Sequence, residues 1–209
     1  MFSKGNSTDQ IKIVYAFGDS LTDGSTSNPD PAQKFGYINV VSQLLGWKIV
    51  NHAVGGTKIG DSTQSQYMSL IPALPKDRIV WLTGYNDMRA NGTNSAGIDA
   101  YGVTLNTLLT TLSAYGCPIL LGNCLKMTAT GYTQGSPDFS NGSDAAVAAF
   151  NAKISTVASN FPLVTLIDVS TAFVPTNGDM QGDNVHFNFS GCYKLGNAFV
   201  SAIRTAGKN

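Results

Sequence analysis

The stretch IVYAFGDSLTDG, residues 13–24, begins with apolar and aromatic residues and changes abruptly to small polar ones at Asp19 and Ser20. Near-continuous apolarity over a few residues, without alternation, is typical of a strand that is covered on both faces of a parallel sheet. The change therefore marks the end of a strand. Two interpretations of Ser20 are open at this point: a turn former, or a nucleophile held at the carboxyl end of the strand.

Four further apolar runs rich in β-branched residues follow, and segments with helical spacing separate them. The five predicted strands cover residues 11–17, 47–50, 78–83, 118–121 and 163–169. Apolar stripes with helical spacing cover residues 35–45, 101–115, 147–157 and 195–203, and Ser143 is a candidate cap for the third. This alternation predicts an α/β fold of three layers, α/β/α, around a five-stranded parallel sheet.

Length and charge narrow the classes of function. The 209 residues show no composition break, so we expect a single domain over 1–209, with 1–10 as a flexible segment. Lys and Arg number 13 against 13 Asp and Glu, and no basic stripe occurs, which argues against nucleic acid and membrane surfaces as partners. We expect no signal peptide, no transmembrane segment and no membrane insertion. Charged residues make up only 12%, which suits an extracellular or virion-associated protein.

The three cysteines do not predict a disulfide framework. Cys117 and Cys124 flank one short apolar run whose extended length holds them apart, so a bond between them is not expected. Cys192 follows His186 by six residues and could suggest a thiol nucleophile. Its place at the start of the last predicted helix instead favours a small buried side chain.

Histidine occurs only at positions 52 and 186, so candidates for a general base are few. Asp183 precedes His186 by three residues, a spacing that lets its carboxylate reach Nδ1 of the imidazole on one tight turn. Nε2 could then take a proton from the Ser20 hydroxyl. His186 could equally be a turn residue beside a helix-capping Asp183. His52 is expected to be structural, although it lies where it could line a pocket.

Attack of a serine on an ester carbonyl creates an oxyanion, which needs hydrogen-bond donors already in place. The Ser20 amide, an amide at Gly55 and Gly56, and the Asn86 side chain are candidate donors. They follow the first three predicted strands, whose carboxyl ends share one edge of the sheet. The glycines alone could form an ordinary turn and Asn86 a helix cap, but their joint occurrence on one edge favours a catalytic site.

Four segments, in this order, resemble the motif blocks of the SGNH hydrolases, also called GDSL esterases and lipases. FGDSLTDG at 17–24 is similar to the first block, NHAVGG at 51–56 to the second, GYND at 84–87 to the third and DNVHFN at 183–188 to the last. The sequence departs from the family pattern at Ala53, where glycine is frequent, and at Phe187, where proline is common. Neither departure removes a catalytic group.

The resemblance implies the SGNH hydrolase fold, a five-stranded, flavodoxin-like, doubly wound sheet. It implies a catalytic triad of Ser20, Asp183 and His186, and an oxyanion hole made of the Ser20 and Gly56 amides and the Asn86 side chain. The implied activity is ester hydrolysis through an acyl-enzyme, with no metal and no cofactor.

The predicted loops at this edge are polar and uncharged, with scattered aromatic residues, a mixture that suits a sugar ring. The aromatic residues are Tyr85, Tyr132, Phe139, Phe173 and Phe187. We therefore predict a carbohydrate O-acetylesterase acting on small-molecule or polysaccharide esters, with Tyr85, Phe187 and His52 as candidate substrate-binding residues. The alternative is a short-chain carboxylesterase or lysophospholipase-type enzyme.

A hypothesis of another class is a non-catalytic glycan-binding or structural module of a phage tail-like assembly, which the low charge would also suit. The candidate catalytic residues are all intact, which weighs against this hypothesis because a binding module has no need of them.

Overall fold

A computed structural model describes residues 12–24, 35–61, 68, 77–134 and 137–208, so the predicted flexible segment 1–10 lies outside the described residues. Within these ranges the chain forms one parallel sheet with strand order β2-β1-β3-β4-β5. The strands are β1 (Ile13–Gly18), β2 (Lys48–Asn51), β3 (Arg78–Leu82), β4 (Ile119–Gly122) and β5 (Val164–Ile167). The winding direction reverses between β1 and β3, which confirms the doubly wound, flavodoxin-like α/β fold.

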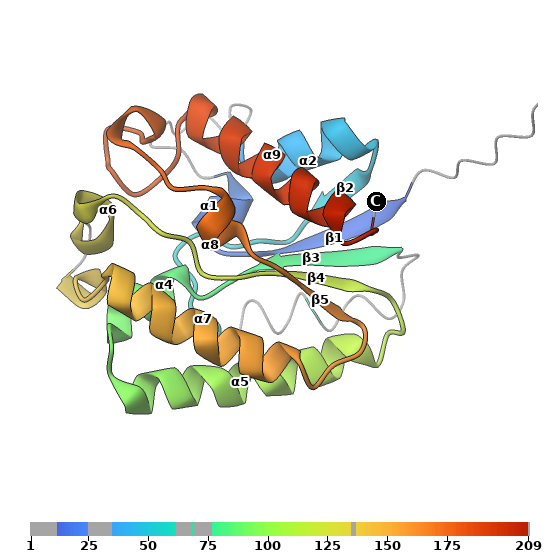
Figure 1. The fold of residues 1–209 in the computed structure, drawn as a ribbon, viewed down its shortest axis with the longest axis horizontal. Helices are drawn as coiled ribbons and strands as arrows, with labels where there is room; N and C mark the ends of the chain where they lie inside the picture. The colour runs from blue at the N-terminus through green and yellow to red at the C-terminus, as the bar shows by residue number, and fades with distance from the viewer. Residues whose placement is uncertain (1–11, 25–34, 62–67, 69–76, 135–136, 209) are drawn as a thin grey trace, which may run out of the picture.

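Helices cover both faces of the sheet (Figure 1), as the apolar runs predicted. The helices α2 (Tyr37–Leu45) and α9 (Phe189–Thr205) pack together on one face, and α5 (Ser95–Ser113) packs with α7 (Asp144–Ala158) on the other. Ser143 caps α7 as predicted, because its hydroxyl accepts a hydrogen bond from the Ala146 amide at 3.1 Å. Among the described residues, no helix combines the length and apolarity needed to cross a bilayer.

The segments at the carboxyl ends of the strands, predicted as loops, contain short helices. They are α1 (Ser20–Asp23), α4 (Tyr85–Asn91), α6 (Ala129–Thr133), α8 (Val169–Ala172), and the 3-10 turns η3 (Pro137–Phe139) and η4 (Asn177–Asp179). β5 ends earlier than predicted because Asp168 accepts hydrogen bonds from the Thr171 amide and hydroxyl and so begins α8. In Figure 1, α1, α4 and α6 all lie toward the left of the view, at the carboxyl-end edge of the sheet.

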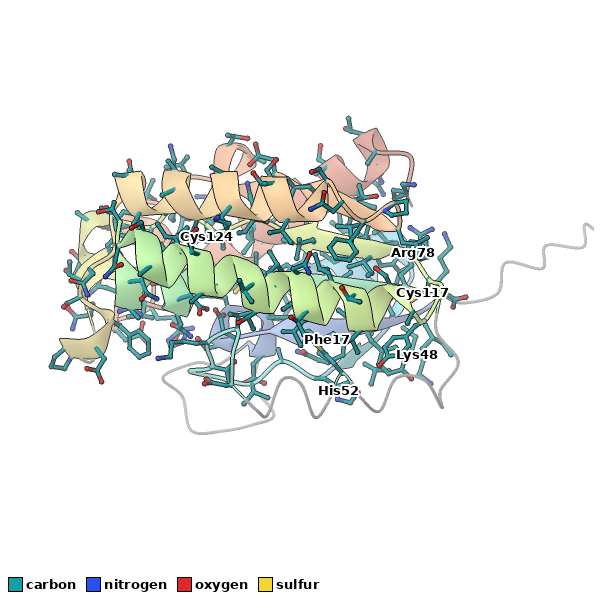
Figure 2. All side chains as sticks on the ribbon, turned by 90° about the horizontal axis from the view of Figure 1, so that it is seen from below. Phe17, Lys48, His52, Arg78, Cys117 and Cys124 are labelled. Atoms are coloured by element: carbon teal, nitrogen blue, oxygen red, sulfur yellow. The ribbon has the colours of Figure 1, made fainter. Side chains whose placement is uncertain are left out.

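All three cysteines are buried and free. Figure 2 shows Cys117 and Cys124 far apart along the sheet, which agrees with their positions before and after β4. The expectation that they form no disulfide is confirmed.

The contact between α2 and α9 depends on a glycine. A Cβ added at Gly196 would lie 2.5 Å from Cβ of Val40 and 2.9 Å from the carbonyl oxygen of Tyr37. Neither atom can move without moving α2, so this position sets how closely the two helices approach. Because α9 begins directly after the segment that carries His186, the same contact helps to hold that segment on the sheet.

We expect Gly196→Ala to destabilise the fold by about 1–3 kcal/mol, because the added methyl group forces α9 away from α2. The free energy of unfolding from a urea titration measures the effect. Gly60→Ala is the matched control: a Cβ at Gly60 meets nothing within 4 Å, so its effect should stay within about 0.5 kcal/mol. Equal effects at both positions would contradict the packing argument.

Candidate active site

Ser20 is the first residue of α1, directly beyond β1, and is 7% exposed. Asp19 caps this helix by accepting a hydrogen bond from the Leu21 amide at 2.9 Å. The turn between strand and helix needs glycine at position 18, where φ is +149° and a Cβ would lie 2.6 Å from the Leu82 carbonyl oxygen. The strand therefore turns sharply at this position and presents the Ser20 side chain at the edge of the sheet.

Asp183 and His186 lie on one turn, and the Asp183 carboxylate accepts hydrogen bonds within it. Oδ2 of Asp183 lies 2.6 Å from Nδ1 of His186, and Oδ1 accepts the amides of Val185 and His186 at 3.0 Å each. Among the described residues other than glycine, Asn184 alone has a positive φ, +56°. The helix-capping alternative for Asp183 is wrong, because Asn188 caps α9 by accepting the Gly191 amide.

The environment of Asp183 keeps its carboxylate ionised. Burial raises the pKa of Asp183, but the hydrogen bonds from the His186 ring and from the amides of His186 and Val185 outweigh burial and lower the pKa below its ordinary value. An ionised carboxylate at this distance favours a proton on Nδ1, which leaves Nε2 as the acceptor. It also stabilises the imidazolium that forms when Nε2 takes a proton.

Ser20 and His186 line one small pocket. Its other lining residues are Leu21, Gly24, Phe35, Phe187 and Cys192. The cavity volume is about 10 Å³, roughly the space that one water molecule needs. The structure thus brings together a hydroxyl and an imidazole that the sequence separates by 166 residues.

Three candidate donors for an oxyanion meet at the same edge of the sheet. The Asn86 side chain, buried in the first turn of α4, donates to the Thr57 carbonyl oxygen at 3.0 Å, and its amide group carries a second hydrogen. Gly56 adopts a left-handed conformation with φ +78° in an exposed turn. In the described part of the chain, neither the Ser20 amide nor the Gly56 amide donates a hydrogen bond. The idea that Asn86 is a helix cap is wrong, because Gly84 is the N-cap of α4.

A hydroxyl beside an imidazole that a carboxylate orients, with N–H donors nearby, can carry out nucleophilic substitution at an acyl carbon. The sequence model of the GDSL-like lipase/acylhydrolase family matches residues 16–192, which include all of these groups. The chain belongs to the GDSL-like lipase/acylhydrolase family. It is therefore a carboxylic ester hydrolase, as its motif blocks predicted.

Solved structures of GDSL-like hydrolases share the fold. A lipase/acylhydrolase from Enterococcus faecalis is 17% identical, with 94% of this chain and 97% of that chain covered and a TM-score of 0.70. A catalytic mutant of an acetylxylan esterase from Geobacillus stearothermophilus is 19% identical, with 92% and 94% covered and a TM-score of 0.68. No curated protein sequence matches this chain.

The remaining candidate residues of this GDSL-like hydrolase occupy different surroundings. Phe187 is buried and lines the pocket of Ser20 and His186. Tyr85 is buried and donates its hydroxyl to the Gly131 carbonyl oxygen at 3.0 Å. His52 stacks on two rings of β1, those of Tyr15 and Phe17, at 5.7 and 5.9 Å, and burial lowers its pKa. Of the three, Phe187 alone is among the pocket's described lining residues. A role of any of them in substrate binding stays a prediction.

Cys192 lies in the same pocket wall but is not poised as a nucleophile. Burial raises the pKa of its thiol to about 11, so the thiolate is scarce at neutral pH. Its Sγ contacts the carbonyl oxygens of Phe35 and Phe187 at 3.3 and 3.6 Å. The prediction of a buried, small side chain is confirmed. No cluster of three His, Cys, Asp or Glu side chains suited to a metal ion occurs among the described residues.

Asp19 and Asp87 are two buried carboxyl groups near the site, and nothing in the sequence predicted their raised pKa values. Burial raises the pKa of Asp19 to about 7, although the Leu21 amide opposes this, and the charge of Asp87 raises it further. Burial likewise raises the pKa of Asp87 to about 6, against the hydrogen bond that the Ile59 amide donates to it at 3.0 Å. The bond from Ile59 to Asp87 and the bond from the Asn86 side chain to Thr57 together hold the segment after Gly56 against α4.

The raised pKa of Asp19 predicts a pH-dependent stability. In the unfolded chain its pKa is near 3.8, so the unfolded state loses this proton first and the folded state loses stability as the pH rises from about 4 to about 7. Asp19→Asn keeps a capping oxygen but cannot ionise. Its urea midpoint should therefore fall less than the wild-type midpoint between about pH 4.5 and about pH 8. Asp99→Asn, at an exposed carboxylate, should leave the fall unchanged. Identical slopes for Asp19→Asn and the wild type would contradict the assignment.

Asp183→Asn should lower kcat for p-nitrophenyl acetate by about 10³- to 10⁴-fold, because an amide cannot hold the imidazole in the required tautomer or stabilise the imidazolium. Steady-state kinetics at about pH 8 measure the loss of kcat. Asp99→Asn, which removes a surface carboxylate paired with Lys153, should retain activity within about twofold. A loss of less than about tenfold in Asp183→Asn would contradict the predicted catalytic role of Asp183.

Proposed function

We propose that this GDSL-like hydrolase is a carbohydrate O-acetylesterase in which Ser20, His186 and Asp183 act as nucleophile, general base and orienting carboxylate. The observation that carries the proposal is the size of the pocket shared by Ser20 and His186, about 10 Å³. Leu21 and Phe187 are among its walls and are both buried. So small a space beside apolar walls suits a methyl group better than a long acyl chain.

In the proposed mechanism, Oγ of Ser20 attacks the acetyl carbonyl carbon while Nε2 of His186 takes the hydroxyl proton. The Ser20 and Gly56 amides and the Asn86 side chain donate to the oxyanion. Collapse of this intermediate breaks the bond to the sugar oxygen, which receives the proton from His186. Water then attacks the acetyl-enzyme with His186 again as base, and acetate and free Ser20 result.

The carbohydrate part of the proposal rests on the surroundings of the pocket. Uncharged polar residues dominate the segments at the carboxyl ends of the strands, and the chain carries no net charge. Such a surface offers hydrogen bonds to sugar hydroxyl groups without attracting an anionic lipid surface. The same low charge supports an extracellular or virion-associated location, which we propose with it.

An ester panel tests the proposal. We expect acetate release from ethyl acetate and from acetylated xylo-oligosaccharides, and at least about 100-fold lower kcat/KM for ethyl octanoate, because the pocket fits a methyl group better than an octanoyl chain. Ser20→Ala should abolish turnover and labelling by a fluorophosphonate probe. Val103→Ala, at an exposed position on α5, is the matched control and should retain both.

The other outcomes have definite meanings. A preference for octanoate would favour the lipid esterase alternative over an acetylesterase. Wild-type protein that neither labels nor releases acid from any ester would overturn the catalytic proposal and favour a glycan-binding module. Activity retained in Ser20→Ala would show that another residue is the nucleophile.

A further inference from the structure

A row of three aromatic rings, Phe35, Phe189 and Tyr193, extends along the start of α9. The Phe35 and Phe189 rings stack with centroids 4.9 Å apart and planes 25° apart. Phe189 and Tyr193, one helical turn apart, stack at 6.5 Å and 12°. We call this set the aromatic row. It combines a residue before α2 with two residues from the opposite end of the chain, so it exists only in the folded protein.

The aromatic row is open to solvent. Phe189 is 68% exposed and Tyr193 is 51% exposed. The other exposed large apolar residues among those described are aliphatic and lie outside α9: Leu44, Val103 and Val174. Single exposed apolar side chains are ordinary, but contiguous exposed apolar patches mark binding sites.

The aromatic row begins at the catalytic pocket. Phe35 lines the pocket together with Ser20 and His186. Its carbonyl oxygen accepts a hydrogen bond from Sγ of Cys192 at 3.3 Å, which ties this end of the row to α9. From Phe35 the stacked rings lead through Phe189 to Tyr193, away from the pocket. A group attached to an ester held at Ser20 would therefore meet these rings.

Beside the aromatic row, the described residues supply one balanced ion pair and two uncharged polar side chains. Nζ of Lys194 bonds to the buried carboxylate of Asp179, and the Ser190 hydroxyl donates to the same carboxylate at 3.2 Å. The Asn197 side chain donates to the Tyr193 carbonyl oxygen at 2.8 Å. Among the described residues this surface offers a hydroxyl group, an amide group and a balanced ion pair, which suits a neutral polyhydroxylated ligand better than an anionic headgroup.

Four of the five aromatic residues that the sequence suggested for a sugar face are buried, and the fifth, Phe139, is half-buried with the Arg89 guanidinium 5.5 Å from its ring. Tyr85, Tyr132, Phe173 and Phe187 are each at most 6% exposed. Their rings are part of the core, where Phe173 and Phe187, for example, pack edge to face at 5.3 Å. Near the pocket, exposed ring surface comes from the aromatic row instead.

We propose that the aromatic row is a subsite for a pyranose ring of the sugar that carries the acetyl group. The apolar C–H face of the sugar packs on the rings of Phe189 and Tyr193, while its hydroxyl groups stay in water or reach the neighbouring polar side chains. The inference rests on the proposed acetylesterase function, because it takes the acetyl group to occupy the small pocket and the alcohol to lie outside it.

The test compares Phe189→Ala, Tyr193→Ala and the double variant with the wild type on two substrates. KM for acetylated xylo-oligosaccharides should rise by about tenfold in the double variant, with kcat little changed, because the lost contact binds ground state and transition state alike. Ethyl acetate has no sugar, so its kcat/KM should stay within about twofold. Val103→Ala is the matched control for loss of an exposed apolar side chain, and thermal melting verifies that all variants are folded.

Each result that departs from this expectation contradicts a different part of the proposal. If the wild type releases acetate from the oligosaccharides and the double variant does so with unchanged KM, the subsite is wrong and the acetylesterase proposal stands. If the wild type releases acetate from ethyl acetate but not from the oligosaccharides, the carbohydrate proposal itself fails. A selective loss of ethyl octanoate hydrolysis in the variants would assign the row to an acyl chain. A wild-type dimer in sedimentation that the double variant converts to a monomer would assign it to a second copy of the chain.

Discussion

The parallel pairing of β1 with its neighbours is the constraint on which the site depends. Gly18 pairs with Leu82 of β3, so the chain leaves both strands at one level, toward Ser20 on one and Asn86 on the other. On the opposite side, the Val54 amide donates to the Gly18 carbonyl oxygen at 3.0 Å and fixes the segment that follows β2. A one-residue slip in either pairing would separate the groups proposed to stabilise an oxyanion from the proposed nucleophile.

Asp183 and His186 lie in the segment after β5, and hydrogen bonds within that segment hold its shape. Asn188 donates its amide to the Asp179 carbonyl oxygen at 2.9 Å, and the Gln181 amide donates to the His186 carbonyl oxygen at 2.8 Å. Hydrogen bonds from the Thr176 hydroxyl at 2.8 Å and from Lys194 hold the buried Asp179 carboxylate. His186 therefore lines the pocket that it shares with Ser20 as part of a preformed unit, which would lower the entropic cost of the proposed catalysis.

The carboxyl groups at the carboxyl-end edge of the sheet are of two kinds, those with a lowered pKa and those with a raised pKa. Asp183 is bonded to an imidazole and two amides, and its pKa falls. Asp19 and Asp87 are more deeply buried, and burial raises the pKa of both; the charge of Asp87 raises the pKa of Asp19 further. The GDSL motif thus places an easily protonated carboxyl group directly before Ser20, while the ionised carboxylate is bonded to Nδ1 of His186. The balance between burial and hydrogen bonds, rather than residue type, decides which carboxyl group has the raised pKa.

Local sequence determined much of this protein. Continuous apolar runs predicted the five strands, Ser143 predicted a cap, and four ordered motif blocks predicted the family, because each of these features depends on a few neighbouring residues. The short helices α1 and α4 had no such signal, since a glycine turn and a capping side chain create them at the strand ends. Tertiary structure alone decided that Tyr85 is buried and that Phe189 is exposed, because burial depends on which elements pack over a ring. It alone joined Phe35 to the start of α9, since stacking between residues 154 positions apart requires the folded sheet to bring both chain ends to one edge.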